Sequence, residues 1–72
     1  MSTMKVNIGK ALKELRKANG LTQQQVADNL GISRVNYTRY ETGASNPDYE
    51  TLLMLANYFD VSLDFIFGRK DI

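Results

Sequence analysis

Apolar residues recur along this chain at spacings of three and four positions, which is the periodicity of one face of an α-helix. Between residues 7 and 18 the apolar stripe consists of Ile8, Ala11, Leu12, Leu15 and Ala18. The lysines of this segment lie off the stripe, and Asn19 and Gly20 follow it with the backbone freedom that ends helices. The pattern predicts an amphipathic first helix over about residues 7–18.

A short second helix is predicted to begin at Thr22. Thr22 and Gln25 have the spacing of a capping box, in which each side chain bonds a backbone amide of the other residue. Gly31, which adopts a positive φ at little cost, is expected to end this helix. Its inward positions are Val26, Ala27 and Leu30.

A third helix is predicted directly after a tight turn. Ser33 is expected to cap it, and it runs to about Thr42, before Gly43, with Tyr37 and Tyr40 facing inward. The small Ala27 faces the angle between the second and third helices, where a larger side chain would hold them apart. Such a right-angled pair lets its second helix protrude far enough to enter the major groove of DNA.

Two more helices are predicted in the second half of the chain. Asp48, or Asn46 with Pro47 in the first turn, is expected to cap the fourth helix. The apolar positions of that helix are Leu52, Leu55, Ala56 and Phe59. A short fifth helix is expected between its cap, Ser62, and Gly68, with Val61 and Ile66 spaced as a hydrophobic staple.

These elements predict an all-α, five-helix domain over residues 7–68, with a helix-turn-helix formed by its second and third helices. Residues 1–6 are expected to form an N-terminal arm, and residues 69–72 a C-terminal tail. A chain of 72 residues buries only about 60% of its unfolded surface, which leaves little room for a second domain or an active-site cleft.

The composition excludes several kinds of chemistry. The chain has no cysteine and no histidine, which removes disulfides, the usual zinc ligands and the commonest general base. We therefore expect no enzyme activity, no catalytic residue, no metal, no cofactor and no small-molecule ligand. Because no apolar run reaches 18 residues and the N-terminus lacks a signal-peptide core, we expect a cytoplasmic protein without a membrane partner.

The formal net charge of +1 conceals an uneven distribution. Residues 1–39 carry seven basic and two acidic side chains, a net charge of +5, whereas residues 40–72 carry two basic and six acidic ones, a net charge of −4. This asymmetry favours one face that attracts a polyanion and another that is turned away from it. The alternative is a set of scattered charges that keep solvated helices soluble.

The most informative stretch is LTQQQVADNLGISRVNYTRYETG, which is followed by a proline, by TLLMLANYF and by VSLDFIFG. In this order the residues resemble the lambda-repressor/Cro-like family, also called the XRE family, over about residues 8–68. Tyr37 stands where that family often has a smaller aliphatic residue. The resemblance implies a five-helix lambda-repressor-like fold and a transcriptional regulator, chiefly a repressor that binds a palindromic operator in double-stranded DNA as a homodimer.

In such families the third helix reads the bases. The outward residues of the third helix here are Ser33, Arg34, Val35, Asn36 and Arg39. Arginine donates two parallel hydrogen bonds to guanine, asparagine pairs in the same way with adenine, and apolar groups contact the thymine methyl. Arg39 is as well placed for a phosphate as for a base. For each of these residues the alternative is ordinary solvent exposure, most of all for Val35.

Phosphate contacts are expected at the start of the second helix and in the loop after the third. By the resemblance Gln23 is the best phosphate ligand, and Thr22 stands beside free helical N–H groups. The loop candidates are Thr42, Gly43, Ser45 and Asn46. Related repressors pair an arginine with a glutamate beneath the phosphate backbone, so we expect Arg16 and Glu41 to meet, with Arg16 held ready for a phosphate.

One module of this kind buries only roughly 600–1,000 Å² on DNA, which is too little for the tight and selective binding that a repressor needs. A dimer is therefore expected. The predicted interface is the fifth helix, where Leu63 and Phe65 have no inward place, together with Asp64 and Tyr49. Alternatively, Phe65 folds over its own fourth helix. The alternative function is an antitoxin-like or bridging module of the same fold whose main partner is a protein.

Overall fold

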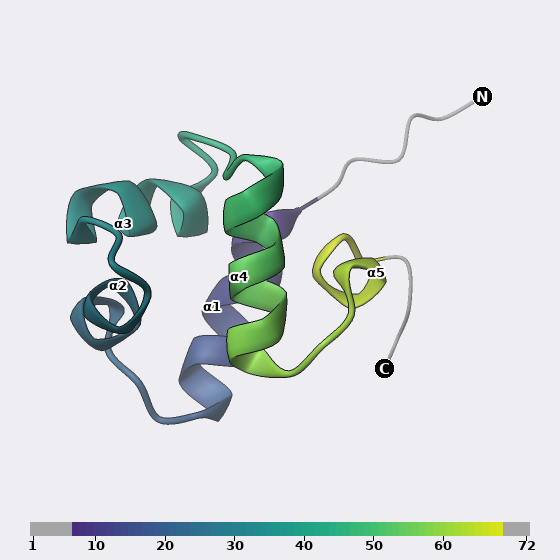
Figure 1. Ribbon diagram of the computed structural model, residues 1–72, viewed down its shortest axis with the longest axis horizontal. Coiled ribbons are helices and arrows are strands. Elements are labelled where there is room, and N and C mark those ends of the chain that lie inside the picture. The colour runs from purple at the N-terminus through teal and green to yellow at the C-terminus, as the bar shows by residue number, and fades with distance from the viewer. Residues whose placement is uncertain (1–6, 69–72) are drawn as a thin grey trace.

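The computed structural model describes residues 7–68, which form five helices and no strand within that range (Figure 1). The helices are α1 (Ile8–Ala18), α2 (Gln23–Leu30), α3 (Arg34–Thr42), α4 (Tyr49–Phe59) and α5 (Leu63–Ile66). The expected all-α, five-helix architecture is confirmed. The predicted arm over residues 1–6 and tail over residues 69–72 lie outside the described residues.

Each helix begins at a polar side chain that accepts a hydrogen bond from a backbone amide of the first turn. The five capping residues are Asn7, Thr22, Ser33, Asp48 and Ser62. The capping box of Thr22 and Gln25 is complete, with both reciprocal hydrogen bonds present. Of the two residues considered for the start of α4, Asp48 is the cap, since its carboxylate accepts the amide of Thr51 at 2.8 Å. Caps of this kind satisfy amides that no preceding turn can reach.

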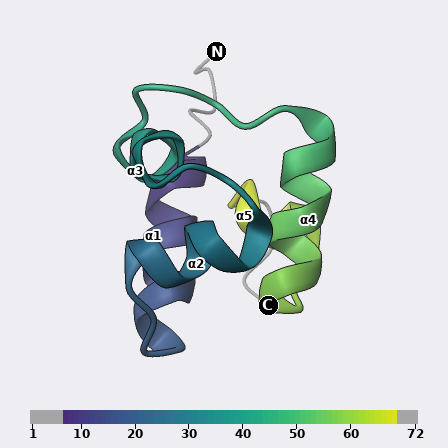
Figure 2. The same ribbon diagram turned by 60° about the vertical axis from the view of Figure 1, so that its left-hand side comes forward.

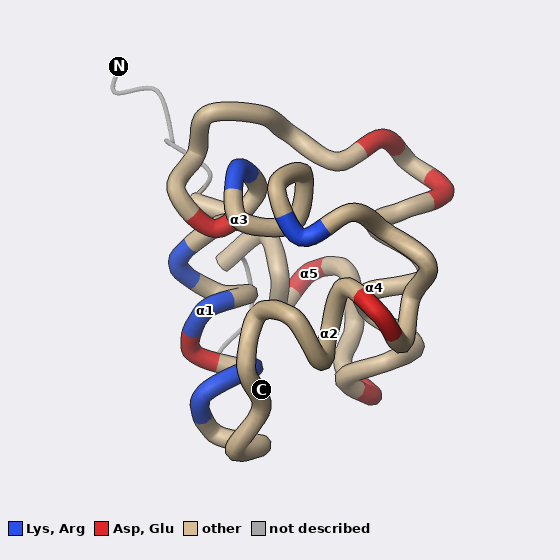
Figure 3. Tube along the Cα trace, turned by 90° about the vertical axis from the view of Figure 1, so that its left-hand side faces the viewer, with Lys and Arg blue, Asp and Glu red and all other residues tan. Residues whose placement is uncertain are grey.

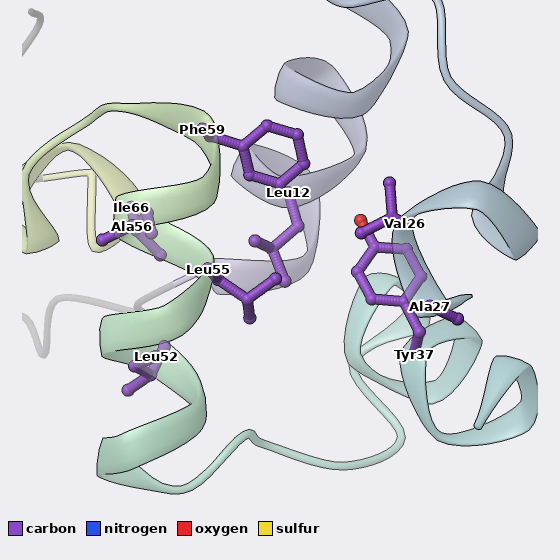
Figure 4. Packing of buried hydrophobic residues seen from close by; sticks show 9 residues of the cluster. All are labelled: Leu12, Val26, Ala27, Tyr37, Leu52, Leu55, Ala56, Phe59 and Ile66. Atoms are coloured by element: carbon purple, nitrogen blue, oxygen red, sulfur yellow. The ribbon is translucent and has the colours of Figure 1, made fainter. Parts of the chain in front are cut away.

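The core is formed by nine apolar side chains drawn from all five helices (Figure 4). They are Leu12, Val26, Ala27, Tyr37, Leu52, Leu55, Ala56, Phe59 and Ile66. Every one of them was an inward position in the apolar pattern. One position of that pattern was wrong: Ala18 is exposed. It is the last residue of α1, and the chain turns away directly after it.

The helix-turn-helix occupies one side of the molecule. α2 is seen along its axis in Figure 1 and from the side in Figure 2, whereas α3 shows the reverse, so the two helices cross steeply. Gly31 ends α2 with a φ of 69°, and the amide of Ile32 then bonds the carbonyl of Ala27 at 2.9 Å. This left-handed turn changes the direction of the chain within the three residues between α2 and α3, as the sequence predicted.

α1 lies close against the C-terminal end of α3. A Cβ atom added at Gly9 would lie 2.3 Å from the carbonyl oxygen of Glu41 and 2.6 Å from that of Tyr40. No side chain fits in that space, so the approach of α1 to α3 depends on the absence of one. Gly9 was not among the residues predicted to matter for packing.

None of the helices within residues 7–68 combines the length and the apolar character needed to cross a lipid bilayer.

Candidate nucleic-acid interface

The outward face of α3 carries the residues predicted to read bases. Ser33, Arg34, Val35, Asn36 and Arg39 are all exposed, and Val35 keeps 69% of its accessible surface. Ser33 also has a structural task, since its hydroxyl accepts the amide of Asn36 at 3.1 Å. Arg34 makes no hydrogen bond to any residue in the described range, so its guanidinium is available to a partner. The structure thus brings these five residues to the surface around the first turns of α3.

Arg39 is held differently from Arg34. Its Nε donates to the hydroxyl of Ser45 at 2.9 Å, and its Nη2 reaches the carbonyl oxygen of Ala44 at 3.5 Å. The guanidinium therefore lies along the loop that follows α3. Of the two roles considered for Arg39, this placement favours contact with a phosphate over contact with a base edge.

The predicted ion pair between Arg16 and Glu41 is confirmed. Arg16 Nε donates to Glu41 Oε2 at 2.6 Å, and Nη2 donates to Oε1 at 3.1 Å, in a bidentate pair. Arg16 Nη1 donates in addition to the carbonyl of Leu21 at 2.9 Å. The side chains are 12% and 2% exposed, so the pair joins α1 to the end of α3 largely away from water. Paired guanidinium and carboxylate groups tolerate such burial because each satisfies the other.

Gln23, the predicted phosphate ligand, is attached to the same pair. Its Nε2 donates to Glu41 Oε1 at 3.0 Å, and its Oε1 accepts from the hydroxyl of Thr38 at 3.0 Å. Thr38 was not among the predicted site residues. A threonine in the middle of a helix leaves no sequence signal for such a contact, which depends on how α2 and α3 are placed.

The carboxyl group of Glu41 and the phenol of Tyr37 both have pKa values that depart from their ordinary ones. Burial opposes ionisation of Glu41, but hydrogen bonds from Arg16 and Gln23 outweigh it and hold the pKa of Glu41 below its usual value. Burial raises the pKa of Tyr37 far above that of a free tyrosine, and the neighbouring carboxylate of Glu41 acts in the same direction. Glu41 is therefore charged and Tyr37 neutral at physiological pH.

An open depression lies where α2 begins. The residues that line it are Arg16, Leu21, Thr22, Gln23, Gln24 and Arg34. Within the described part of the chain, the backbone amides of Gln23 and Gln24 have no acceptor, as expected in the first turn of a helix. Arg34, the positive end of α2 and Arg16, whose charge is paired with Glu41, thus border one hollow.

The loop after α3 offers fewer backbone donors than predicted. The amide of Ser45 bonds the carbonyl of Arg39 at 3.2 Å, and the amide of Ala44 bonds the hydroxyl of Thr42 at 3.4 Å. These two amides are occupied inside the protein. Among residues 7–68, no acceptor is found for the amides of Gly43 and Asn46. The amides of Gly43 and Asn46 therefore remain the candidates for binding a phosphate.

The predicted dimer surface is only partly as expected. Leu63 was expected to find no apolar neighbours within the monomer, and this is wrong: it packs against the core, because α5 lies against both α1 and α4. Phe65 is half-buried but lies outside the core cluster, and Asp64 is exposed. Tyr49 is 67% exposed at the start of α4.

Two further apolar side chains on α4, which sequence analysis did not name, are also exposed. They are Leu53 and Met54, four and five residues after Tyr49. Leu53, four residues after Tyr49, lies on the same side of the helix as that residue.

Charges are divided between two sides of the molecule. Figure 3 shows the basic residues along α1 and α3, and acidic residues in the loop before α4 and around α4 and α5, with further acidic residues on α1, on α2 and at the end of α3. The separation along the sequence therefore becomes a separation in space. The helix predicted to read bases lies on the basic side.

The fold and the surface of α3 together define a helix-turn-helix domain. A family model described as helix-turn-helix matches residues 12–66. The chain therefore belongs to the helix-turn-helix family, in its lambda-repressor/Cro-like (XRE) branch.

Three relatives illustrate the proteins to which the chain is similar. It is 54% identical over 55 residues to the uncharacterized HTH-type transcriptional regulator YqaE of Bacillus subtilis, over 76% of this chain and 47% of YqaE. It is 39% identical to the CTXphi transcriptional repressor RstR of Vibrio cholerae, over 89% of this chain and 57% of RstR. It is also 43% identical to the antitoxin PezA of Streptococcus pneumoniae, over 86% of this chain and 39% of PezA. The chain thus spans about half the length of these relatives or less.

Solved structures confirm the lambda-repressor-like fold. A transcriptional regulator from Listeria innocua superposes with a TM-score of 0.85 at 30% identity, over 96% of this chain and 64% of that one. The P22 c2 repressor, solved with a synthetic operator, superposes with a TM-score of 0.82 over 93% of this chain and all of that one. Its identity of 22% makes it a likeness of fold alone.

Proposed function

We propose that this chain is the sequence-specific, double-stranded-DNA-binding part of a cytoplasmic transcriptional regulator, acting as a repressor. The observation that carries the proposal is the unpartnered Arg34, exposed at the start of α3 beside a depression that Arg16 and Gln23 also line. A free guanidinium next to a group of phosphate-binding donors combines base recognition with backbone anchoring at one place. The similarity to RstR, which is described as a transcriptional repressor, supports repression as the mode of regulation.

In the proposed complex the first turn of α3 enters the major groove. Arg34 donates both of its parallel N–H groups to a guanine, and the exposed methyls of Val35 contact a thymine methyl. Asn36 takes the next base pair, and Ser33 lies at the edge of the groove. Arg39, held along the loop by Ser45, contacts the sugar-phosphate backbone.

Phosphates are bound at two places in this proposal. One lies in the depression at the start of α2, where Thr22, Gln23 and the partly exposed Arg16 converge. The other lies at the loop after α3, where the amides of Gly43 and Asn46 have no acceptor among residues 7–68 and Thr42 and Ser45 shape the turn. The two sites flank α3 and thereby fix its orientation in the groove.

The test begins with selection of bound sequences from a random duplex library, followed by titration of the selected site and its single-base variants. Arg34→Ala is expected to lose about 1–3 kcal/mol of discrimination per half-site at one base pair. Gln23→Ala, the matched control, should weaken all sequences by a similar factor. An Arg34→Ala protein that discriminates among the variants as well as the parent would contradict base reading by Arg34.

We further propose that two copies bind a palindromic operator. Half-sites one helical turn apart, about 34–36 Å, need two α3 helices related by a two-fold axis. Phe65, Asp64 and Tyr49 are the proposed contacts, with Leu63 contributing only its partly exposed edge. This surface belongs to the acidic side of the molecule, which DNA repels.

Phe65→Asp tests the dimer. It is expected to leave the fold intact and to abolish cooperative filling of a palindromic site in a titration of both half-sites. Asn57→Asp, which adds the same charge to an exposed position of α4 without removing an apolar side chain, should bind as cooperatively as the parent. Undiminished cooperativity of Phe65→Asp would place the contact elsewhere.

A protein partner is the second candidate function, and the similarity to the antitoxin PezA favours it. A gel shift with random duplex DNA over a salt series separates the two candidates. DNA binding through phosphates is expected to weaken steeply and linearly on logarithmic axes as salt rises. Failure to bind any duplex at low salt would favour the protein partner.

A further inference from the structure

We propose that Thr38 is a positioning residue that fixes the side-chain amide of Gln23 in the orientation needed to bind a phosphate. The inference rests on the proposed DNA-binding function. Thr38 lies in the middle of α3 and is half-buried, and its hydroxyl donates to Gln23 Oε1 at 3.0 Å. Within residues 7–68, the side chain of Gln23 forms two hydrogen bonds with α3, one with Thr38 and one with Glu41.

The two ends of the Gln23 amide are held by different residues of α3. Glu41 Oε1 accepts from Gln23 Nε2 at 3.0 Å and from Arg16 Nη2 at 3.1 Å. An ionised carboxylate only accepts hydrogen bonds, so an inverted amide would place its oxygen against another oxygen. Glu41 therefore selects which end of the amide faces it, and Thr38 holds the opposite end.

This arrangement leaves one donor of Gln23 unused. An amide nitrogen carries two hydrogens, and Glu41 takes only one of them. The other has no acceptor among the described residues, while the side chain lines the depression beside Arg34. A glutamine that is already ordered loses less rotamer freedom when it binds a phosphate than a free one does.

Thr38 itself has no other evident task at the surface. Its hydroxyl is committed to Gln23, and the residue lies outside the apolar core cluster. Replacing the hydroxyl by a methyl group of similar size removes the hydrogen bond with little change of shape. Arg34 and Val35, about one turn nearer the start of α3, form no hydrogen bond with the Thr38 side chain.

The experiment is a double-mutant cycle on DNA affinity with Thr38→Val, Gln23→Ala and the double variant, and with Thr38→Ser as the conservative rescue. Titrations use a random-sequence duplex and a duplex carrying the selected site. Thr38→Val is expected to weaken both by about two- to twelve-fold per bound chain, the effect of immobilising one flexible side chain. Thr38→Ser should restore the affinity, and the loss should vanish in the Gln23→Ala background.

A second measurement reads the amide without DNA. The side-chain amide signals of Gln23 in NMR spectra should report an ordered group in the parent and in Thr38→Ser, and a mobile one in Thr38→Val. If Thr38→Val does not fold, Thr38→Ala removes the same hydroxyl and takes its place in both measurements.

The failures of the two proposals are distinguishable. A parent protein that binds no duplex at low salt overturns the proposed function and the role of Thr38 with it. A parent that binds DNA while Thr38→Val binds equally well overturns only the role of Thr38. A Thr38→Val loss that persists undiminished in the Gln23→Ala background also overturns it, because the effect would not pass through Gln23.

Discussion

Tyr37 is the largest fully buried side chain, and its hydroxyl is the one buried side-chain polar atom without a hydrogen-bond partner in the described part of the chain. It lies beside Glu41 and Arg16 but forms no hydrogen bond with either. A buried polar group left unpaired costs about 1–3 kcal/mol. The ring fills space that the family more often gives to a smaller aliphatic side chain, and the hydroxyl comes with it.

Tyr37→Phe is therefore expected to raise the free energy of unfolding, by about 1 kcal/mol, because it removes the unpaired hydroxyl and keeps the ring. Urea denaturation of the parent and the variant measures the difference. Tyr40→Phe, at a partly exposed tyrosine of the same helix, is the control and should change stability by less. A clear loss of stability in Tyr37→Phe would mean that the hydroxyl is bonded in solution.

At the scale of single residues, the sequence predicted charged contacts better than polar ones. The pairing of Arg16 with Glu41 followed from the family resemblance. The attachment of Gln23 to Glu41 and Thr38 did not, because glutamine and threonine are ordinary surface residues whose partners depend on the placement of two helices. The contact of Arg39 with Ser45 likewise depends on the course of the loop after α3, which the sequence does not give.

At the scale of helices, starts and stops were predictable because their causes are local. A capping side chain and a glycine in the left-handed conformation act within four residues. The close approach of α1 to α3 is not local, and so Gly9 was missed. A signal was present, since glycine inside a helix is unfavourable by about 1 kcal/mol relative to alanine and thus needs a reason.

Gly9→Ala is expected to lower the free energy of unfolding despite the better helix propensity of alanine. The added methyl group would meet backbone carbonyls of α3 that cannot rotate away, and overpacking of this kind costs about 1–3 kcal/mol. Thermal unfolding of the variant measures the effect. Lys10→Ala, at the adjacent exposed position, should stay within about 0.5 kcal/mol of the parent. A stabilised Gly9→Ala protein would show that α1 and α3 are farther apart than described.

At the scale of the whole molecule, the Arg16–Glu41 pair makes stability depend on pH. The pKa of Glu41 is lower in the folded chain than its ordinary value of 4.5, because hydrogen bonds from Arg16 and Gln23 outweigh the opposing effect of burial. A group with a lowered folded pKa contributes stability that is present above the unfolded value and is lost as pH falls through the folded one. The contribution is therefore complete at pH 7 and declines below about pH 4.5.

Glu41→Gln is expected to be less stable than the parent at pH 7 by about 3 kcal/mol, the lower end of the effect of breaking a buried pair. Below pH 4.5 its stability should fall less steeply than that of the parent, since the variant has no carboxylate to protonate at this position. Urea midpoints between pH 7 and pH 3 measure both effects. Asp48, whose pKa is also lowered by its cap to Thr51, is present in both proteins and cancels in the comparison. Parallel pH profiles of the two proteins would contradict the assignment.

The separation of charge has a kinetic consequence. Over residues 7–68, all six basic residues lie on α1 and α3 and four of the seven acidic ones lie in or beside α4 and α5, so the described part of the chain is an electric dipole. In the field of a polyanion such a dipole experiences a torque, which turns the basic side forward before any contact is made. The rotational search that precedes docking is thereby shortened. The benefit fades as ionic strength rises, because the Debye length, roughly 10 Å at 0.1 M salt, limits the distance over which the field acts.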